Sequence, residues 1–165
     1  MKKWLSFAVL SLLGSSFAAT YVHPDDNLRG VTLCIDNDSF VAQVGALSSV
    51  SQKLAQGLYD HFVEQATTMK IPFKEMGETS CSDWAVDMSF EATTGTPRAW
   101  NAMLWVSDDG AYASLKENDA YNNPVSVWSD GSFGVLVDND GLTDYLIGEG
   151  EALIDGLLTA YNKVN

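Results

Sequence analysis

Residues 83–93 alternate between apolar and polar side chains, and this pattern constrains the fold more than any other in the chain. The apolar positions are Trp84, Val86, Met88 and Phe90, and most of the residues between them are polar. A period of two places alternate side chains on opposite faces of a β-strand. One covered face and one wet face are typical of an antiparallel sheet. The sequence therefore predicts such a sheet, with a layer of other elements packed on its apolar face.

Two segments have the helical periodicity that such a layer needs. In residues 47–69 the apolar stripe consists of Val50, Leu54, Leu58, Phe62, Ala66 and Met69. In residues 143–164 it consists of Leu146, Leu153, Leu157, Tyr161 and Val164. Spacings of three and four residues predict an amphipathic helix in each segment. Ser48 or Ser49 is expected to cap the first helix, and Thr143 the second.

Glycines interrupt the second of these predicted helices at Gly148, Gly150 and Gly156. Each weakens a helix by about 1 kcal/mol relative to alanine. A helix tolerates this cost where it must lie close against a sheet, so we expect a close approach along this segment.

Shorter strands are predicted on both sides of the first helix. They cover residues 31–36, 98–106 and 111–115, and a hairpin of 125–128 with 133–137 is expected to turn at Asp130-Gly131. Residues 37–46 are predicted to be a loop. The expected order is β-α-β-β-β-β-β-α. The predicted fold class is α+β: a two-layer sandwich whose antiparallel-rich sheet has about five or six strands, with both helices on one face. One core is expected, formed by Leu54, Leu58, Phe62, Trp84, Val86, Met88, Phe90, Leu153 and Leu157.

The first 18 residues have the three-part order of a signal peptide. A short basic start precedes an apolar run over residues 4–13, and mostly small residues follow it. This order predicts cleavage after Ala18 and a single mature domain over residues 19–165, secreted or periplasmic. The apolar run is too short to span a bilayer, so no membrane span is expected. No cysteine follows the run directly, so no lipid anchor is expected either.

Two cysteines, Cys34 and Cys81, are present in the chain. An even number of cysteines in an exported protein predicts a disulfide, here Cys34–Cys81. The formal net charge is −13. Nucleic acids and anionic lipid surfaces both require a basic footprint, so neither is expected as a partner. An acidic surface suits solubility, cations or basic partners.

Two acidic turns resemble each other along the chain. In each, an apolar strand runs into Asp-Asn-Asp and then toward a helix. If the two strands run the same way, the turns meet at one end of the sheet and offer oxygen ligands to Ca²⁺. The candidate ligands are Asp36, Asp38, Asp138 and Asp140. Ordinary turn chemistry is the favoured interpretation, because Asp and Asn are common in turns. No other cofactor is expected.

Aromatic and methionine side chains indicate a binding surface. The segment around residues 100–106 is apolar on both faces, so one set should emerge opposite the helices. The candidate partner-binding residues are Met103, Trp105, Tyr112 and Trp128. Such a patch can hold a protein or glycan partner. The alternative is that the irregular N-terminal segment of residues 21–30, called here the lead-in, or the loop of residues 116–123 folds over this patch.

Catalytic constellations are weak in this sequence, and no residue is assigned a catalytic role. His61 lies within a predicted helix and His23 in the lead-in, and a bridged cysteine is no nucleophile. A carboxylate-dependent, glycosidase-like hydrolase is the alternative function, with Asp87, Glu91 and Glu117 as candidates. A calcium-binding exported protein is a further alternative.

The predicted order of elements resembles small bacterial envelope accessory proteins, several of them lipoproteins, that place two helices on one sheet. The resemblance rests on element order, and the chain departs from the lipoprotein members in lacking the lipid-attachment cysteine. It implies an accessory role at the envelope. The sequence thus favours an exported, non-enzymatic binding or accessory protein of the cell envelope or extracellular space.

Overall fold

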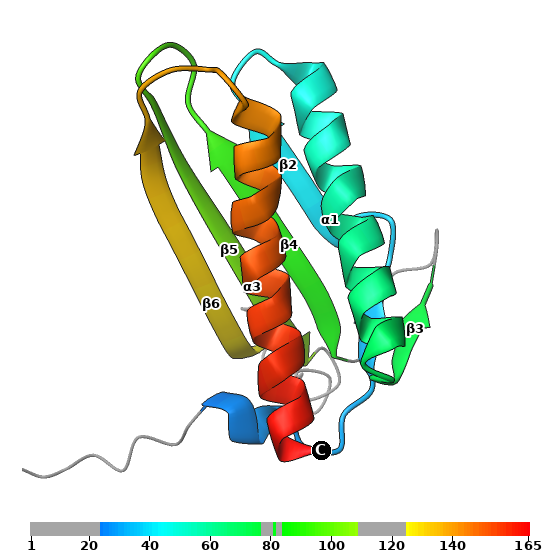
Figure 1. The fold of residues 1–165 in the computed structure, drawn as a ribbon. Coiled ribbons are helices and arrows are strands. Elements are labelled where there is room, and N and C mark those ends of the chain that lie inside the picture. The colour runs from blue at the N-terminus through cyan, green and yellow to red at the C-terminus, as the bar shows by residue number, and fades with distance from the viewer. Residues whose placement is uncertain (1–23, 77–80, 82–83, 109–124) are drawn as a thin grey trace, which may run out of the picture.

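The computed structural model describes residues 24–76, 81, 84–108 and 125–165. A short 3-10 helix, η1 (Pro24–Leu28), comes first. The elements that follow are β1 (Leu33–Ile35), β2 (Phe40–Val44), α1 (Ser48–Thr68), β3 (Phe73–Glu75), β4 (Ala85–Ala92), β5 (Arg98–Asp108), β6 (Val125–Leu136) and α3 (Leu142–Val164). Helices α1 and α3 lie side by side on one face of the sheet, which confirms the predicted two-layer α+β architecture (Figure 1).

The six-stranded sheet is mixed, which corrects the expectation of an antiparallel-rich sheet. Its order is β3-β1-β4-β5-β6, and β2 also pairs with β4. The pairs β1–β3, β1–β4 and β2–β4 are parallel, whereas β4–β5 and β5–β6 are antiparallel. Helix α1 carries the chain back along the sheet after β2, and β3 and β4 then start from the same end as β1. That return makes the first half of the sheet parallel.

The predicted loop at residues 37–46 contains β2. Strands β1 and β2 follow one another along the same edge of β4: Cys34 pairs with Ala85, and the five β2 residues pair with Met88 to Ala92. The Asp-Asn-Asp turn separates them. Because turn residues separate the two strands, β2 was predicted to be loop, although it begins only four residues after β1 ends.

Strand β6 is continuous, so the predicted hairpin at Asp130-Gly131 is wrong. Strand β5 pairs with β6 along its length, from Arg98 with Leu136 to Asp108 with Val125, with one irregularity after Val106. The glycines of β6 make room for β5 side chains. A Cβ at Gly131 would come 2.4 Å from Met103 Sδ, and one at Gly134 would come 2.8 Å from Trp100 Nε1. The predicted strand at residues 111–115 lies outside the described residues.

The core lies between the two helices and the sheet, as predicted. Eight of the nine expected core side chains are buried in one cluster, and Trp84 packs against it half-buried. Phe90 is fully buried, and its ring stacks on that of Trp100 at 5.5 Å between centroids. The alternation in β4 therefore does point its apolar side toward the helices.

Neither described helix begins with the side-chain cap that the sequence predicted. Leu47 occupies the N-cap of α1 and Gly141, with φ of 65°, that of α3. Ser51, in the first turn of α1, links the helix to β2: its hydroxyl accepts from Val44 N at 2.9 Å and donates to Leu47 O at 3.1 Å. Within the described residues, neither helix has the length and apolarity that crossing a membrane requires.

Two of the glycines of α3 have different surroundings. Gly150 is buried, and a Cβ there would come 2.4 Å from Leu58 Cδ2 on α1. Gly148 is exposed, and nothing lies within 4 Å of its would-be Cβ. The close approach that the glycines predicted is therefore made at Gly150, against the neighbouring helix.

We predict opposite effects for two alanine substitutions in α3. Gly148→Ala should stabilise the protein by about 0.5–1 kcal/mol, because alanine favours the helix and meets no neighbour. Gly150→Ala should destabilise it by about 1–3 kcal/mol, because the methyl group forces Leu58 out of its place in the core. Urea unfolding of both variants and the wild type measures the difference. Equal stabilisation by both substitutions would mean that the helices do not touch at Gly150.

Candidate functional site

The sheet face opposite the helices is the first candidate site. In β5, Trp100, Ala102, Leu104 and Val106 are buried toward the helices. Asn101 and Met103, at the alternate positions, are exposed, and Trp105 is half-buried. No described helix covers this second face, called here the open face (Figure 1).

Cross-strand rows organise the open face. One row runs through Gln43, Glu91, Asn101 and Phe133, each paired with the next across β2, β4, β5 and β6. The next row runs through Val41, Ser89, Met103 and Gly131. Paired residues on one face lie close enough to interact. The centre of the open face is therefore polar, and its β6 side is apolar.

The apolar side of the open face is strongly exposed. Phe133 exposes 86% of its surface and Val135 exposes 64%. Met103 exposes 45% and lies over Gly131. Val137, which follows β6, is also exposed. Large apolar side chains gathered on one surface mark interaction sites more often than scattered ones do.

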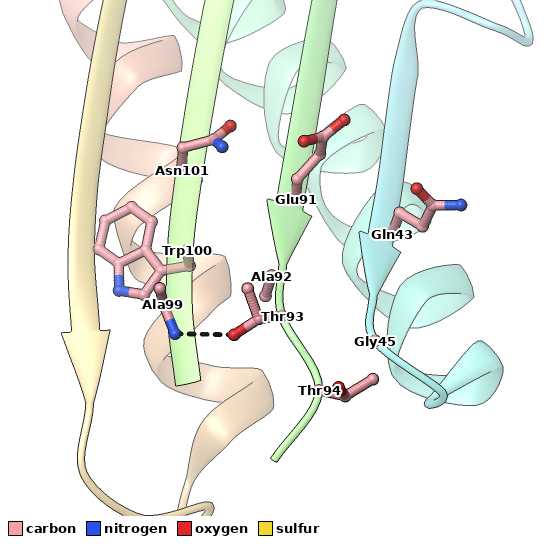
Figure 2. A pocket seen from close by; sticks show the side chains of 9 residues that line it. All are labelled: Gln43, Gly45, Glu91, Ala92, Thr93, Thr94, Ala99, Trp100 and Asn101. Atoms are coloured by element: carbon pink, nitrogen blue, oxygen red, sulfur yellow. Dashed lines mark hydrogen bonds between the residues drawn. The ribbon is translucent and has the colours of Figure 1, made fainter. Parts of the chain in front are cut away.

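A shallow pocket of about 440 Å³ lies at the end of the open face where β4 and β5 approach their turn (Figure 2). It is lined by Gln43, Gly45, Glu91, Ala92, Thr93, Thr94, Ala99, Trp100 and Asn101. Among the lining residues, Ala99 N donates to Thr93 Oγ1 at 3.0 Å and so links β5 to the end of β4. One carboxylate and two amide side chains project beside each other. This arrangement can accept hydrogen bonds from donor groups of a partner.

Two of the four predicted partner-binding residues lie where the sequence placed them. Met103 and Trp105 are on the open face. Trp128 is not: it pairs with Val106 on the helix side, is 5% exposed, and donates from its ring nitrogen to Asp25 Oδ1 at 3.4 Å. Tyr112 lies outside the described residues. The expectation for Trp128 was wrong because the strand was assigned as half of a hairpin.

Phe133 and Val135, the most exposed apolar residues of the strands on this face, were not among the predicted site residues. The signal was present in the alternation of residues 131–136. Taken as one strand with β5 as partner, it places both residues on the same side as Met103.

The carboxylates proposed for a hydrolase do not form a close pair. Asp87 and Glu91 lie four residues apart on β4, which separates their Cα atoms by about 13 Å. Glycosidase carboxyl groups lie about 5–9.5 Å apart. Glu117 lies outside the described residues. This geometry does not favour the hydrolase.

The two acidic turns have the same local structure. Asp36 Oδ1 accepts from Asp38 N at 2.9 Å, and Asp138 Oδ1 accepts from Asp140 N at 3.1 Å. Each is an Asx turn, in which a side chain replaces a backbone acceptor. The resemblance in the sequence is therefore a real structural repeat, and turn chemistry explains it.

The turns do not meet, which corrects the premise of a shared calcium site. Strands β1 and β6 do run the same way, because each is parallel to β4. However, β1 pairs at the start of β4, whereas β6 ends beyond the far end of β4, about 30 Å away along the strands. Among the described residues, no three His, Cys, Asp or Glu side chains gather as a metal site would require.

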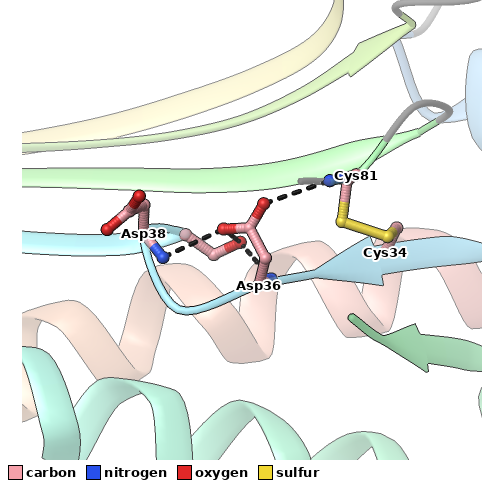
Figure 3. Close-up of a disulfide and its surroundings, with 5 residues drawn as sticks. Cys34, Asp36, Asp38 and Cys81 are labelled. Carbon is pink, nitrogen blue, oxygen red and sulfur yellow. Dashed lines mark hydrogen bonds between the residues drawn. A yellow bond between two sulfur atoms is a disulfide. The ribbon is translucent and has the colours of Figure 1, made fainter. Parts of the chain in front are cut away.

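The Cys34–Cys81 disulfide is confirmed (Figure 3). Its Cα atoms are 5.8 Å apart, and it joins β1 to the segment that leads into β4. Beside it, Asp36 Oδ2 accepts from Cys81 N at 3.1 Å. Closing a loop of 47 residues contributes about 4 kcal/mol in the chain-entropy model. Asp36 therefore holds both its own turn and the bridged segment.

His61 lies between the helices and not in a cleft. Its Nε2 is 2.9 Å from Asp155 Oδ1 and its Nδ1 is 3.5 Å from Glu151 Oε1, both on α3. The imidazole thus links α1 to α3. His23 lies outside the described residues.

No protein-family model matches this chain, and no curated protein matches it. Among solved structures, the chain is similar to a variant of PelC from Paraburkholderia phytofirmans, which is described as a dodecamer. The sequence identity is 11% and the TM-score is 0.45, and the match covers 78% of this chain and 89% of that chain. A second PelC dodecamer structure from the same organism gives 10% identity and a TM-score of 0.38, over 78% and 86% of the two chains. Likenesses this distant carry neither a family nor a function to this chain.

We predict that asparagine substitutions separate the two acidic turns. Asp138→Asn should change stability by less than about 0.5 kcal/mol, because the amide oxygen still accepts from Asp140 N. Asp36→Asn should cost about 1–3 kcal/mol, because the second oxygen that accepts from Cys81 N becomes an NH₂ group and leaves that donor unpaired. Urea unfolding of the oxidised protein measures both. Equal effects would show that Asp36 does not hold the bridged segment.

Proposed function

We propose that this chain is an exported, non-enzymatic binding or accessory protein that engages its partner through the apolar side of the open face. The observation that carries the proposal is the exposure of Phe133 and Val135 on a regular strand. A phenylalanine that is 86% exposed contributes little to the fold of the free chain. Burying it against a partner would contribute about 1.5–3 kcal/mol to binding.

The composition of the surface favours a protein partner over a glycan. Its exposed members, apart from Phe133, are aliphatic or methionine: Met103, Val135 and Val137. Sugar sites are built around flat aromatic rings flanked by converging polar groups, and Trp105 is half-buried. Aliphatic and methionine side chains suit the apolar residues of another protein.

The disulfide supports the export part of the proposal. Disulfides persist in oxidising compartments and are rare in the cytosol. The predicted signal peptide gives the same location from an independent part of the sequence. Together they support a partner at the envelope or outside the cell.

A photo-crosslinking amino acid at position 133 tests the proposal in the cells that make the protein. Phe133 is mostly exposed, so its replacement should leave folding intact. The matched control carries the same crosslinking amino acid at position 52. Gln52 is exposed on α1, in the helix layer on the other side of the sheet. We expect a discrete crosslinked protein from position 133 and none from position 52.

Two results would reject this function. One is the absence of any adduct from position 133 in the native compartment. The other is an equal set of adducts from both positions, which would indicate random collisions with an acidic protein.

A further inference from the structure

Among the residues that the structure describes, strand β6 has one edge without a strand partner. In the part of the chain that the structure describes, β5 is its only strand partner, and β6 closes the sheet order. It is 12 residues long and carries one charged side chain, Asp130. Near its start, Asn27 Nδ2 donates to Val127 O at 2.7 Å, so η1 takes one acceptor there. From Ser129 to Leu136, alternate backbone N–H and C=O groups point away from β5, as on any edge strand.

The two sides of this edge differ in chemistry. On the open face stand Phe133 and Val135. On the helix side, Asp130 is exposed, and Ser132 Oγ donates to Glu149 Oε2 of α3 at 3.3 Å. Past the strand end, Asp138 and Asp140 are exposed as well. One side of the edge is therefore apolar and the other is acidic.

We infer that β6 accepts an extended segment of another protein as an added strand, and that this segment alternates apolar and basic residues. The inference rests on the proposed function and names its mode and partner chemistry. A strand with a period of two places every second side chain on each face. Its apolar residues then cover Phe133 and Val135, and its lysines or arginines lie beside Asp130 and Glu149. Main-chain hydrogen bonds to β6 add affinity that does not depend on the side chains.

The charges argue against a second copy of this chain as the occupant. The chain has 22 acidic and 9 basic residues. Pairing β6 with itself would bring Asp130 and Glu149 of both copies to the same seam, and like charges across paired strands destabilise. A basic segment removes that repulsion. The opposite edge of the sheet is a poorer acceptor, because its strands β3 and β2 have only three and five residues.

The probe is a synthetic peptide of alternating lysine and valine, about eight residues long. Its control is the same peptide with glutamate in place of lysine. Amide hydrogen exchange of the full chain, read by NMR, reports strand addition directly. We expect the basic peptide to slow exchange at every second amide between Ser129 and Leu136, and the acidic peptide to leave exchange unchanged. Binding should weaken as salt is raised, since the charge contacts are exposed.

Single substitutions measure how much individual side chains contribute to the affinity for the basic peptide. Phe133→Ser should weaken binding more than about tenfold, because its ring is the largest apolar contact. Asp130→Asn should weaken it by up to about fivefold, the usual range for one exposed charge pair. Val41→Ser is the control: it is exposed on the open face, but on β2, and should bind like the wild type.

The outcomes separate this inference from the proposed function. Crosslinks from position 133 without any protection of β6 amides would mean that the open face binds its partner without strand addition, and the inference falls alone. Equal protection of the β6 amides by the basic and acidic peptides would overturn the inference that the partner segment is basic. Protection that rises with protein concentration in the absence of peptide, and is lost in Phe133→Ser, would identify a second copy as the occupant and overturn it too.

Discussion

Every other strand of the sheet is placed, directly or through one neighbour, by β4. One edge of β4 pairs with β1 and then β2, and the other edge pairs along the whole length of β4 with β5. Its apolar face, Val86, Met88 and Phe90, is buried beneath the helices. The strand thus fixes which face of the sheet the helices cover. The same choice leaves the alternate residues of β5 and β6 on the open face, where the candidate site lies.

The regular elements with one apolar stripe were predictable from sequence. The residues of β4, α1 and α3 each have one side that can be buried and one that cannot, so periodicity alone determines their orientation. The disulfide was predictable for a similar reason, because only two cysteines were available to pair. Parallel pairing was not predictable in this way. It depends on where α1 returns the chain, and no local pattern in residues 37–46 records that path.

The candidate site was harder to predict because glycines have two uses. Asp130-Gly131 is a turn signal in isolation, but Gly131 lies under Met103 and Gly134 lies under Trp100. Because glycine has no side chain, both positions leave room for large residues of β5. The sequence of β6 alone does not indicate this requirement. The error on the hairpin then misplaced Trp128 and concealed Phe133. Asp36 and Asp138 failed as a shared metal site for a different reason: strand direction was inferred correctly, but strand level along the sheet was not.

The disulfide takes the place of a missing ladder. Strand β1 meets β4 at a single pair, Cys34 with Ala85, and its other neighbour β3 has only three residues. In the remainder of the fold, β4, β5, β6 and the two helices are held by long ladders and one buried core. The side chains of Leu33 and Ile35 anchor β1 in the core, but its backbone has few ladder partners. The covalent bond thus supplies, at the corner formed by β1 and β3, the connection that backbone pairing supplies in the rest of the sheet.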